Sequence, residues 1–195
     1  VKLYNATNGA SWSITWKLNQ PMTSWFGVSL DPASGCVRSL LLGDNNLDGE
    51  IPVELGQLMN LRYLSLYQNK LHGVIPSSIG NIPAREEINL DENLLTGNLS
   101  ASFGNSSSIK LISITNNLLN GNFPLSLTNN TNLFEINLSN NNLKGTIPVE
   151  LSRMSSLRYL NLSNNFFEGS IPSSIGTMTN LREIYLQNNY FIIYM

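Results

Sequence analysis

Few residues of this sequence could take part in catalysis. The only histidine, His72, lies between Leu71 and Gly73, where we expect a surface side chain rather than a general base. The only cysteine, Cys36, has no histidine near it, so a nucleophilic pair is not indicated. The sequence holds neither a glycine-rich phosphate loop nor a histidine and cysteine cluster with metal-ligand spacing. We therefore expect no enzyme activity, no catalytic residue, no metal site and no cofactor.

The one concentrated charge is an acidic group made of Glu86, Glu87, Asp91 and Glu92. On a strand, Glu87 and Asp91 would share a face at a separation of about 13 Å. That separation exceeds the spacing of paired glycosidase carboxylates. Two interpretations stay open, a solvated acidic patch and a docking site for a cationic partner.

An internal repeat determines where these residues can lie. Asparagine recurs every 24 residues, and apolar residues return at fixed places around it, as with Leu64 and Leu66 before Asn69. A fixed period in this range is typical of a solenoid, whose units bury their apolar faces against one another. A buried amide can satisfy backbone groups where the chain turns, so the asparagines predict a structural ladder. Its members are Asn45, Asn69, Asn93, Asn117, Asn141, Asn165 and Asn189.

Each unit also carries the signals of a short strand and a turn. Apolar residues at the fourth and sixth positions predict a strand with one buried face, and successive strands should pair in parallel. Glycine follows each asparagine by four residues in the six complete units, where it suits a tight arch. Ile-Pro or Phe-Pro comes next in five units and predicts the start of a helical turn, whereas the third unit has Leu99-Ser100.

The pattern LxxLxLxxNxLxGxIPxxLGxLxx, as in Leu61–Ala84 and Leu157–Asn180, resembles the plant-type leucine-rich repeat. The resemblance covers residues 37–195, as six full 24-residue units and a truncated seventh. It implies an α/β solenoid, a right-handed superhelix with a parallel β-sheet on its concave face and short helical turns on its convex face. The Gly-x-Ile-Pro segment implies a second, lateral strand in each unit.

Residues 1–36 lack the repeat and hold all three tryptophans, Trp12, Trp16 and Trp25, which we expect to cap the open end of the core. We predict a helix over residues 1–8 ended by Gly9 in the left-handed conformation, a strand over residues 25–30 and a turn over residues 31–35. The segment is similar to the amino-terminal caps of this family, but it is cysteine-poor. Cys36 is alone, so no intrachain disulfide is possible. Cap and repeats together should form one structural domain.

Composition excludes several partners. Charged residues make up 12% of the chain and the net charge is −2, which argues against nucleic acid as a partner. No apolar run reaches the roughly 18 residues needed to span a bilayer. The sequence begins with Val1 and stops within a repeat, so we expect a fragment of a longer protein, in which a membrane span is possible.

Glycosylation motifs say little about the compartment. They occur at Asn5, Asn98, Asn105, Asn129, Asn137 and Asn161. About five are expected by chance from the asparagine, serine and threonine content, so these six do not establish a glycoprotein. An extracellular or cell-surface location is what the family resemblance implies.

Varied residues on the repeated scaffold indicate where a ligand would bind. The third, fifth and seventh positions of each unit should point outward from the concave sheet, and tyrosine and arginine are enriched in binding hot spots. The candidate ligand-binding residues are Arg62, Tyr63, Tyr67, Glu87, Asp91, Arg158, Tyr159 and Tyr185. We predict a non-enzymatic module that binds a protein or peptide ligand, similar to plant receptor ectodomains or secreted polygalacturonase inhibitors.

A polar row at the eighth position supports an alternative. It runs through Asp44, Gln68, Glu92, Asn116, Asn140, Asn164 and Asn188. Some repeat proteins of this family adsorb to ice through regular rows of this kind. The alternative is therefore an ice-binding or surface-adsorbing protein, although the acidic third unit breaks the row.

Overall fold

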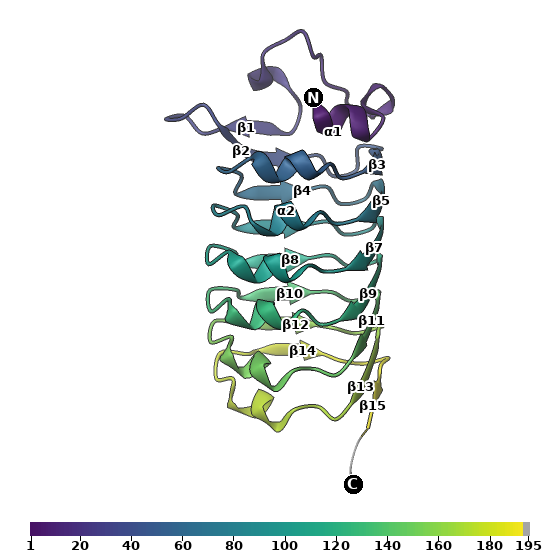
Figure 1. Cartoon of the computed structure of the whole chain (residues 1–195), viewed down its shortest axis with the longest axis vertical. Coiled ribbons are helices and arrows are strands. Elements are labelled where there is room, and N and C mark those ends of the chain that lie inside the picture. Colours follow the sequence, from purple (N-terminus) through teal and green to yellow (C-terminus); the bar gives the residue numbers. More distant parts are fainter. Residues whose placement is uncertain (193–195) are drawn as a thin grey trace.

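Residues 1–192, the part of the chain that the structure describes, form an elongated stack of coils in this computed structural model (Figure 1). Each complete coil contributes one strand to a long sheet, a second strand to a sheet on the flank, and a short helical turn. The α/β solenoid predicted from the repeat is confirmed. No helix among residues 1–192 is long and apolar enough to cross a membrane.

The first sheet, on the concave face, has eight strands in the order β1-β2-β4-β6-β8-β10-β12-β14. Its register advances by one unit per strand, so that Leu64 lies opposite Leu40 on one side and Ile88 on the other. Pairing is parallel throughout except between β1 and β2, which are antiparallel. The strands are β1 Val28–Leu30, β2 Val37–Leu41, β4 Tyr63–Ser65, β6 Glu87–Asn89, β8 Leu111–Ser113, β10 Glu135–Asn137, β12 Tyr159–Asn161 and β14 Glu183–Tyr185.

The second sheet runs along the flank, at the right of Figure 1, in the order β15-β13-β11-β9-β7-β5-β3. It confirms the lateral strand that the resemblance implies. The repeated glycine allows the close approach of neighbouring coils: Gly121 has φ +81°, and a Cβ there would lie 2.3 Å from the side-chain oxygen of Asn98. The strands are β3 Asp48–Glu50, β5 Lys70–Val74, β7 Leu94–Asn98, β9 Leu118–Asn122, β11 Asn142–Gly145, β13 Phe166–Gly169 and β15 Tyr190–Phe191.

Short helical turns cover the convex face. Proline precedes all of the turns of the repeats except that of the third unit, where Ser100 instead accepts a hydrogen bond from the backbone N–H of Ser102. The turns are η3 Val53–Gln57, α2 Ser77–Gly80, η4 Ala101–Asn105, η5 Leu125–Asn129, η6 Val149–Arg153 and η7 Ser173–Thr177.

The repeated asparagines tie each coil to the one before it. The amide nitrogen of Asn141 donates to the carbonyls of Ile114, Leu138 and Ser139 at 2.8, 3.2 and 3.2 Å, and its oxygen accepts from the backbone N–H of Leu119 at 3.0 Å. Ile114 and Leu119 belong to the preceding coil. The side chain thus satisfies buried backbone groups of two successive coils.

The residue before each ladder asparagine has a backbone role that the sequence pattern did not reveal. All seven residues of the eighth-position row have φ between 50° and 57°, in the left-handed region. Asparagine and aspartate tolerate this conformation better than most residues, which explains their frequency at this position.

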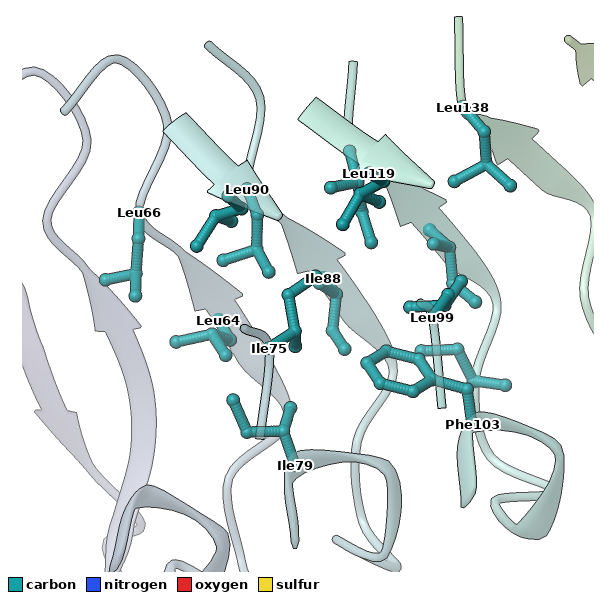
Figure 2. Close-up of a cluster of buried hydrophobic side chains, with 14 of the residues drawn as sticks. Leu64, Leu66, Ile75, Ile79, Ile88, Leu90, Leu99, Phe103, Leu119 and Leu138 are labelled. Atoms are coloured by element: carbon teal, nitrogen blue, oxygen red, sulfur yellow. The ribbon is translucent and has the colours of Figure 1, made fainter. Parts of the chain in front are cut away.

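The core is a continuous column of apolar side chains between the first sheet and the helical turns, and Figure 2 shows part of it around Leu64, Ile88 and Phe103. One residue departs from the pattern. Arg85 occupies the first position of its unit, where every other unit has valine, leucine or isoleucine, and it is fully buried. Its guanidinium donates to the carbonyl of Ile79 and lies 5.0 Å from the ring centre of Phe103, but Nε and Nη2 have no partner among residues 1–192.

The cap begins with α1, Lys2–Ala6, and η1, Gly9–Ser11. The prediction that Gly9 ends the helix in the left-handed conformation is wrong, because Asn8 takes that conformation with φ 53°. Gly9 is required for another reason. A Cβ there would lie 2.3 Å from the ring of Tyr4, so glycine leaves room for the aromatic side chain.

The predicted cap strand over residues 25–30 is also too long, because β1 starts at Val28. It follows the turn η2, Met22–Ser24, and Gly27 with φ +71°, which breaks an extended chain. Trp12, Trp16 and Trp25 are buried, as expected, with Trp16 stacked on Trp25 at a ring-centre distance of 4.7 Å. Each indole N–H donates to a backbone carbonyl of the cap.

Candidate functional site

The concave sheet displays most of the predicted ligand-binding residues. Tyr63 and Glu87 lie opposite each other on β4 and β6, and Tyr159 and Tyr185 lie on β12 and β14 with their ring centres 5.5 Å apart. Tyr67 follows β4, and its ring covers Gly43 of the preceding coil, where a Cβ would be only 2.0 Å from it. The tyrosines therefore form two groups, separated by an acidic stretch.

Carboxylates occupy that stretch. Asp91 accepts hydrogen bonds from the hydroxyl of Ser113 at 2.8 and 2.9 Å and from the backbone N–H of Thr115 at 2.7 Å, which fixes the orientation of its carboxylate. The pKa of Glu135 is raised by partial burial and by the negative charges of Asp91 and Glu87. Glu135 and Glu183 were not among the predicted site residues, although both occupy the third position of their units, which was predicted to point outward from the concave sheet.

Not every outward position is available to a ligand. Ser113, Thr115, Ser139 and Ser163 were expected to point into solvent, but they are buried. Neighbouring polar side chains cover them: Asn161 accepts from the hydroxyl of Ser163 at 2.7 Å, as Asp91 does from Ser113. The accessible concave surface is therefore narrower than the repeat pattern predicted.

Arg62 and Arg158 do not join the concave group but lie in a separate groove. The groove has a volume of about 830 Å³ and follows the edge where the return turns enter the strands, opposite the second sheet (at the left of Figure 1). Lys110 and Phe134 also line it, and the sequence reasoning missed both. Both residues occupy the second position of their 24-residue units, as Arg62 and Arg158 do, and this shared position could have identified them. We call the set at that position the basic row: Arg38, Arg62, Glu86, Lys110, Phe134, Arg158 and Arg182.

The residues considered for catalysis lie apart on the surface. His72 is an exposed residue of β5, and Cys36 is exposed with a free thiol before β2. Within residues 1–192 no group of three or more histidine, cysteine, aspartate or glutamate side chains could hold a metal ion.

Comparison with known families agrees with this architecture. The family model described as Leucine Rich Repeat matches residues 36–58, 60–82 and 132–154, and the model described as Leucine Rich repeats (2 copies) matches residues 155–192. The chain belongs to the leucine-rich-repeat family, and its repeats are of the plant type. No curated protein sequence matches it.

Similar solved structures are plant receptors. The plant peptide hormone receptor RGFR1, in complex with RGF2, is 36% identical, with 75% of this chain and 23% of the receptor covered and a TM-score of 0.73. Pollen Receptor Kinase 3 is 29% identical, with 95% of this chain and 93% of the kinase structure covered and a TM-score of 0.81. The Arabidopsis thaliana receptor kinase GASSHO1/SCHENGEN3, in complex with CASPARIAN STRIP INTEGRITY FACTOR 2, is 27% identical. The match covers 90% of this chain and 24% of the receptor kinase, with a TM-score of 0.76. This chain spans about a quarter of the first and third of these.

Proposed function

We propose that this chain is a non-enzymatic, extracellular recognition module that binds a peptide or protein segment through its concave face. The similar receptor structures that were solved with peptide hormones support the class of ligand. The observation that carries the assignment to this face is the contrast between a monotonous buried scaffold and varied accessible residues, with Tyr63, Tyr67, Glu87 and Asp91 on two adjacent coils. Tyrosine combines a large apolar ring with a hydroxyl, so it suits contact with a peptide.

Alanine replacement of Tyr63, Tyr67, Glu87 and Asp91 together tests this proposal. A peptide selected on the native protein from a random display library serves as the probe, and its affinity is measured by calorimetry. We expect a loss of at least about tenfold, because hot-spot residues each contribute about 2 kcal/mol or more. The melting temperature should fall by at least about 4 °C, because Asp91→Ala leaves the hydroxyl of Ser113 and the N–H of Thr115 without their partner, so affinity is compared well below the unfolding transition.

The matched control replaces four exposed side chains of the second sheet, Lys70, His72, Lys144 and Glu168, with alanine. This control should keep the native affinity. Unchanged binding by the concave variant, or an equal loss in both variants, would remove the assignment to the concave face.

The ice-binding alternative remains a prediction. In its favour, side chains of the eighth-position row bond from coil to coil, as between the Asn188 amide and the Asn164 oxygen at 2.6 Å. Glu92 interrupts the series of amides, and the shared backbone conformation already accounts for the choice of residues. Thermal hysteresis at high protein concentration is the relevant measurement. We expect none, because an ice-adsorbing surface needs an unbroken regular row.

A further inference from the structure

The basic row is held in fixed register along the edge of the solenoid. From Arg62 to Arg182, each row residue donates its backbone N–H to the carbonyl of the row residue one coil earlier, at 2.8 to 2.9 Å. Adjacent coils are about 4.8 Å apart, so the row residues that line the groove, from Arg62 to Arg158, extend over about 19 Å. Five members of the row are cationic and one is anionic, although the chain as a whole is negative.

Glu86 shows how the row accepts a carboxylate. Its two oxygens pair with Arg62 Nη1 at 3.1 Å and Lys110 Nζ at 2.7 Å, one coil to either side. The hydrogen bond from Lys110 is the main reason why the pKa of Glu86 is lowered. Two cations that lie one coil to either side of a carboxylate can therefore both reach it.

The other half of the row has the cations but no carboxylate. Phe134 follows Lys110 with 37% of its surface exposed, and Arg158 and Arg182 come next. Among the described residues, the side chains of Arg158 and Arg182 have no ion-pair or hydrogen-bond partner. Two like charges on adjacent coils repel each other, and a bound anion would relieve that repulsion.

We propose that this groove, together with Arg182 on the coil next to Arg158, binds an extended acidic segment of a partner protein, with carboxylates at Arg158 and Arg182 and an apolar side chain against Phe134. A length of about 19 Å accommodates about six extended residues. The exposed phenylalanine within a charged row favours a peptide, which carries apolar and acidic side chains on one strand, over a uniformly polar acidic polysaccharide. This surface is distinct from the concave face, so the inference stands without the function proposed above.

The probe is a fluorescein-labelled, end-capped peptide of leucine followed by glutamates, and binding is followed by fluorescence anisotropy at about 0.15 M ionic strength, where charges more than about 8 Å away are largely screened. Reversing both free charges, Arg158→Glu with Arg182→Glu, should weaken binding at least about tenfold, because it replaces two attractive pairs with repulsive ones. Glu86→Gln should strengthen binding about threefold, because it frees Arg62 and Lys110 for the peptide. Damage to the fold would not produce such a gain.

The matched control reverses two cations outside the groove, Lys144 on the second sheet and Arg153 on the convex face, and so makes the same change in net charge. It should alter affinity by less than about twofold. Equal losses in both double variants, or no gain with Glu86→Gln, would overturn the groove assignment. Alginate that binds more tightly than the peptide, with the same dependence on Arg158 and Arg182, would assign the groove to an acidic polysaccharide instead. The alanine variant of the concave face should bind this peptide normally.

Discussion

Replacing Arg85 with leucine is expected to raise the melting temperature of this protein by roughly 6 to 12 °C. Arg85 carries a positive charge in a core position that is apolar in every other unit. Burial lowers its pKa to about 10, which corresponds to a cost on the order of 3 kcal/mol for keeping the charged form. Leucine removes that cost together with two unpartnered nitrogen atoms.

The pH dependence of this gain follows from the direction of the shift. Because the folded-state pKa of Arg85 is below its unfolded value, the destabilisation is fully present below the folded-state pKa of about 10 and is relieved only as the pH rises from about 10 towards the unfolded value. The gain should therefore be equal at mildly acidic and mildly alkaline pH. Differential scanning calorimetry at both pH values measures it.

Two further variants show whether charge is the cause. Arg85→Met keeps an unbranched, flexible side chain without the charge and should give a similar gain. Ile109→Leu changes the equivalent position of the next coil and should cost less than about 1.5 kcal/mol. A lower melting temperature for both Arg85 variants would show that the hydrogen bond to Ile79 and the contact with Phe103 outweigh the burial of the charge.

Replacing Asn141 with alanine should destabilise the protein by about 3 to 5 kcal/mol, because it leaves buried backbone groups without partners. The carbonyl of Ile114 and the N–H of Leu119 both bond to this amide and belong to the preceding coil. Their loss weakens the junction between two central coils, where a solenoid has no distant contacts to compensate. We expect the melting temperature to fall by roughly 6 to 20 °C.

Asn142→Ala provides the matched control for the ladder. Asn142 follows Asn141 in the chain, is the first residue of β11 and is exposed. Its replacement should change stability by no more than about 0.5 kcal/mol. Similar effects at both positions, measured by urea unfolding, would contradict the ladder as the main link between coils.

Most of the fold could be predicted because the same sequence signals for a strand and a turn recur in every repeat. The alternation at positions such as Leu64 and Leu66 predicted the concave strands, and their fixed spacing predicted parallel pairing. The cap was less accurate because it occurs once and cannot be averaged over repeats. Asn8 and Gly9 are both compatible with a left-handed residue, and only the backbone of the folded cap shows that Asn8 adopts this conformation while Gly9 makes room for the ring of Tyr4.

The candidate site was predicted only as a set of outward positions. Arg62 and Tyr63 are neighbours in sequence, yet the structure places Arg62 in the edge groove and Tyr63 on the concave sheet. Lys110 and Phe134 share the periodic position of Arg62, but the repeat pattern does not show that the side chains at this position line one groove. The unusual type of Arg85 was also visible in the alignment of units, but its buried contacts were not.

The sequence alone determined the family, the coil register and the side of the coil on which each side chain starts. A period of 24 residues with alternating apolar positions admits one arrangement, since any shift would expose the core. The tertiary structure decided which side chains meet across coils. It places the carboxylate of Glu86 between Arg62 and Lys110, and the hydroxyl of Ser113 under the carboxylate of Asp91. It also buries Arg85 against Phe103 with two nitrogen atoms that have no partner among residues 1–192. These contacts depend on side-chain reach and direction between adjacent coils, which spacing along one chain does not specify.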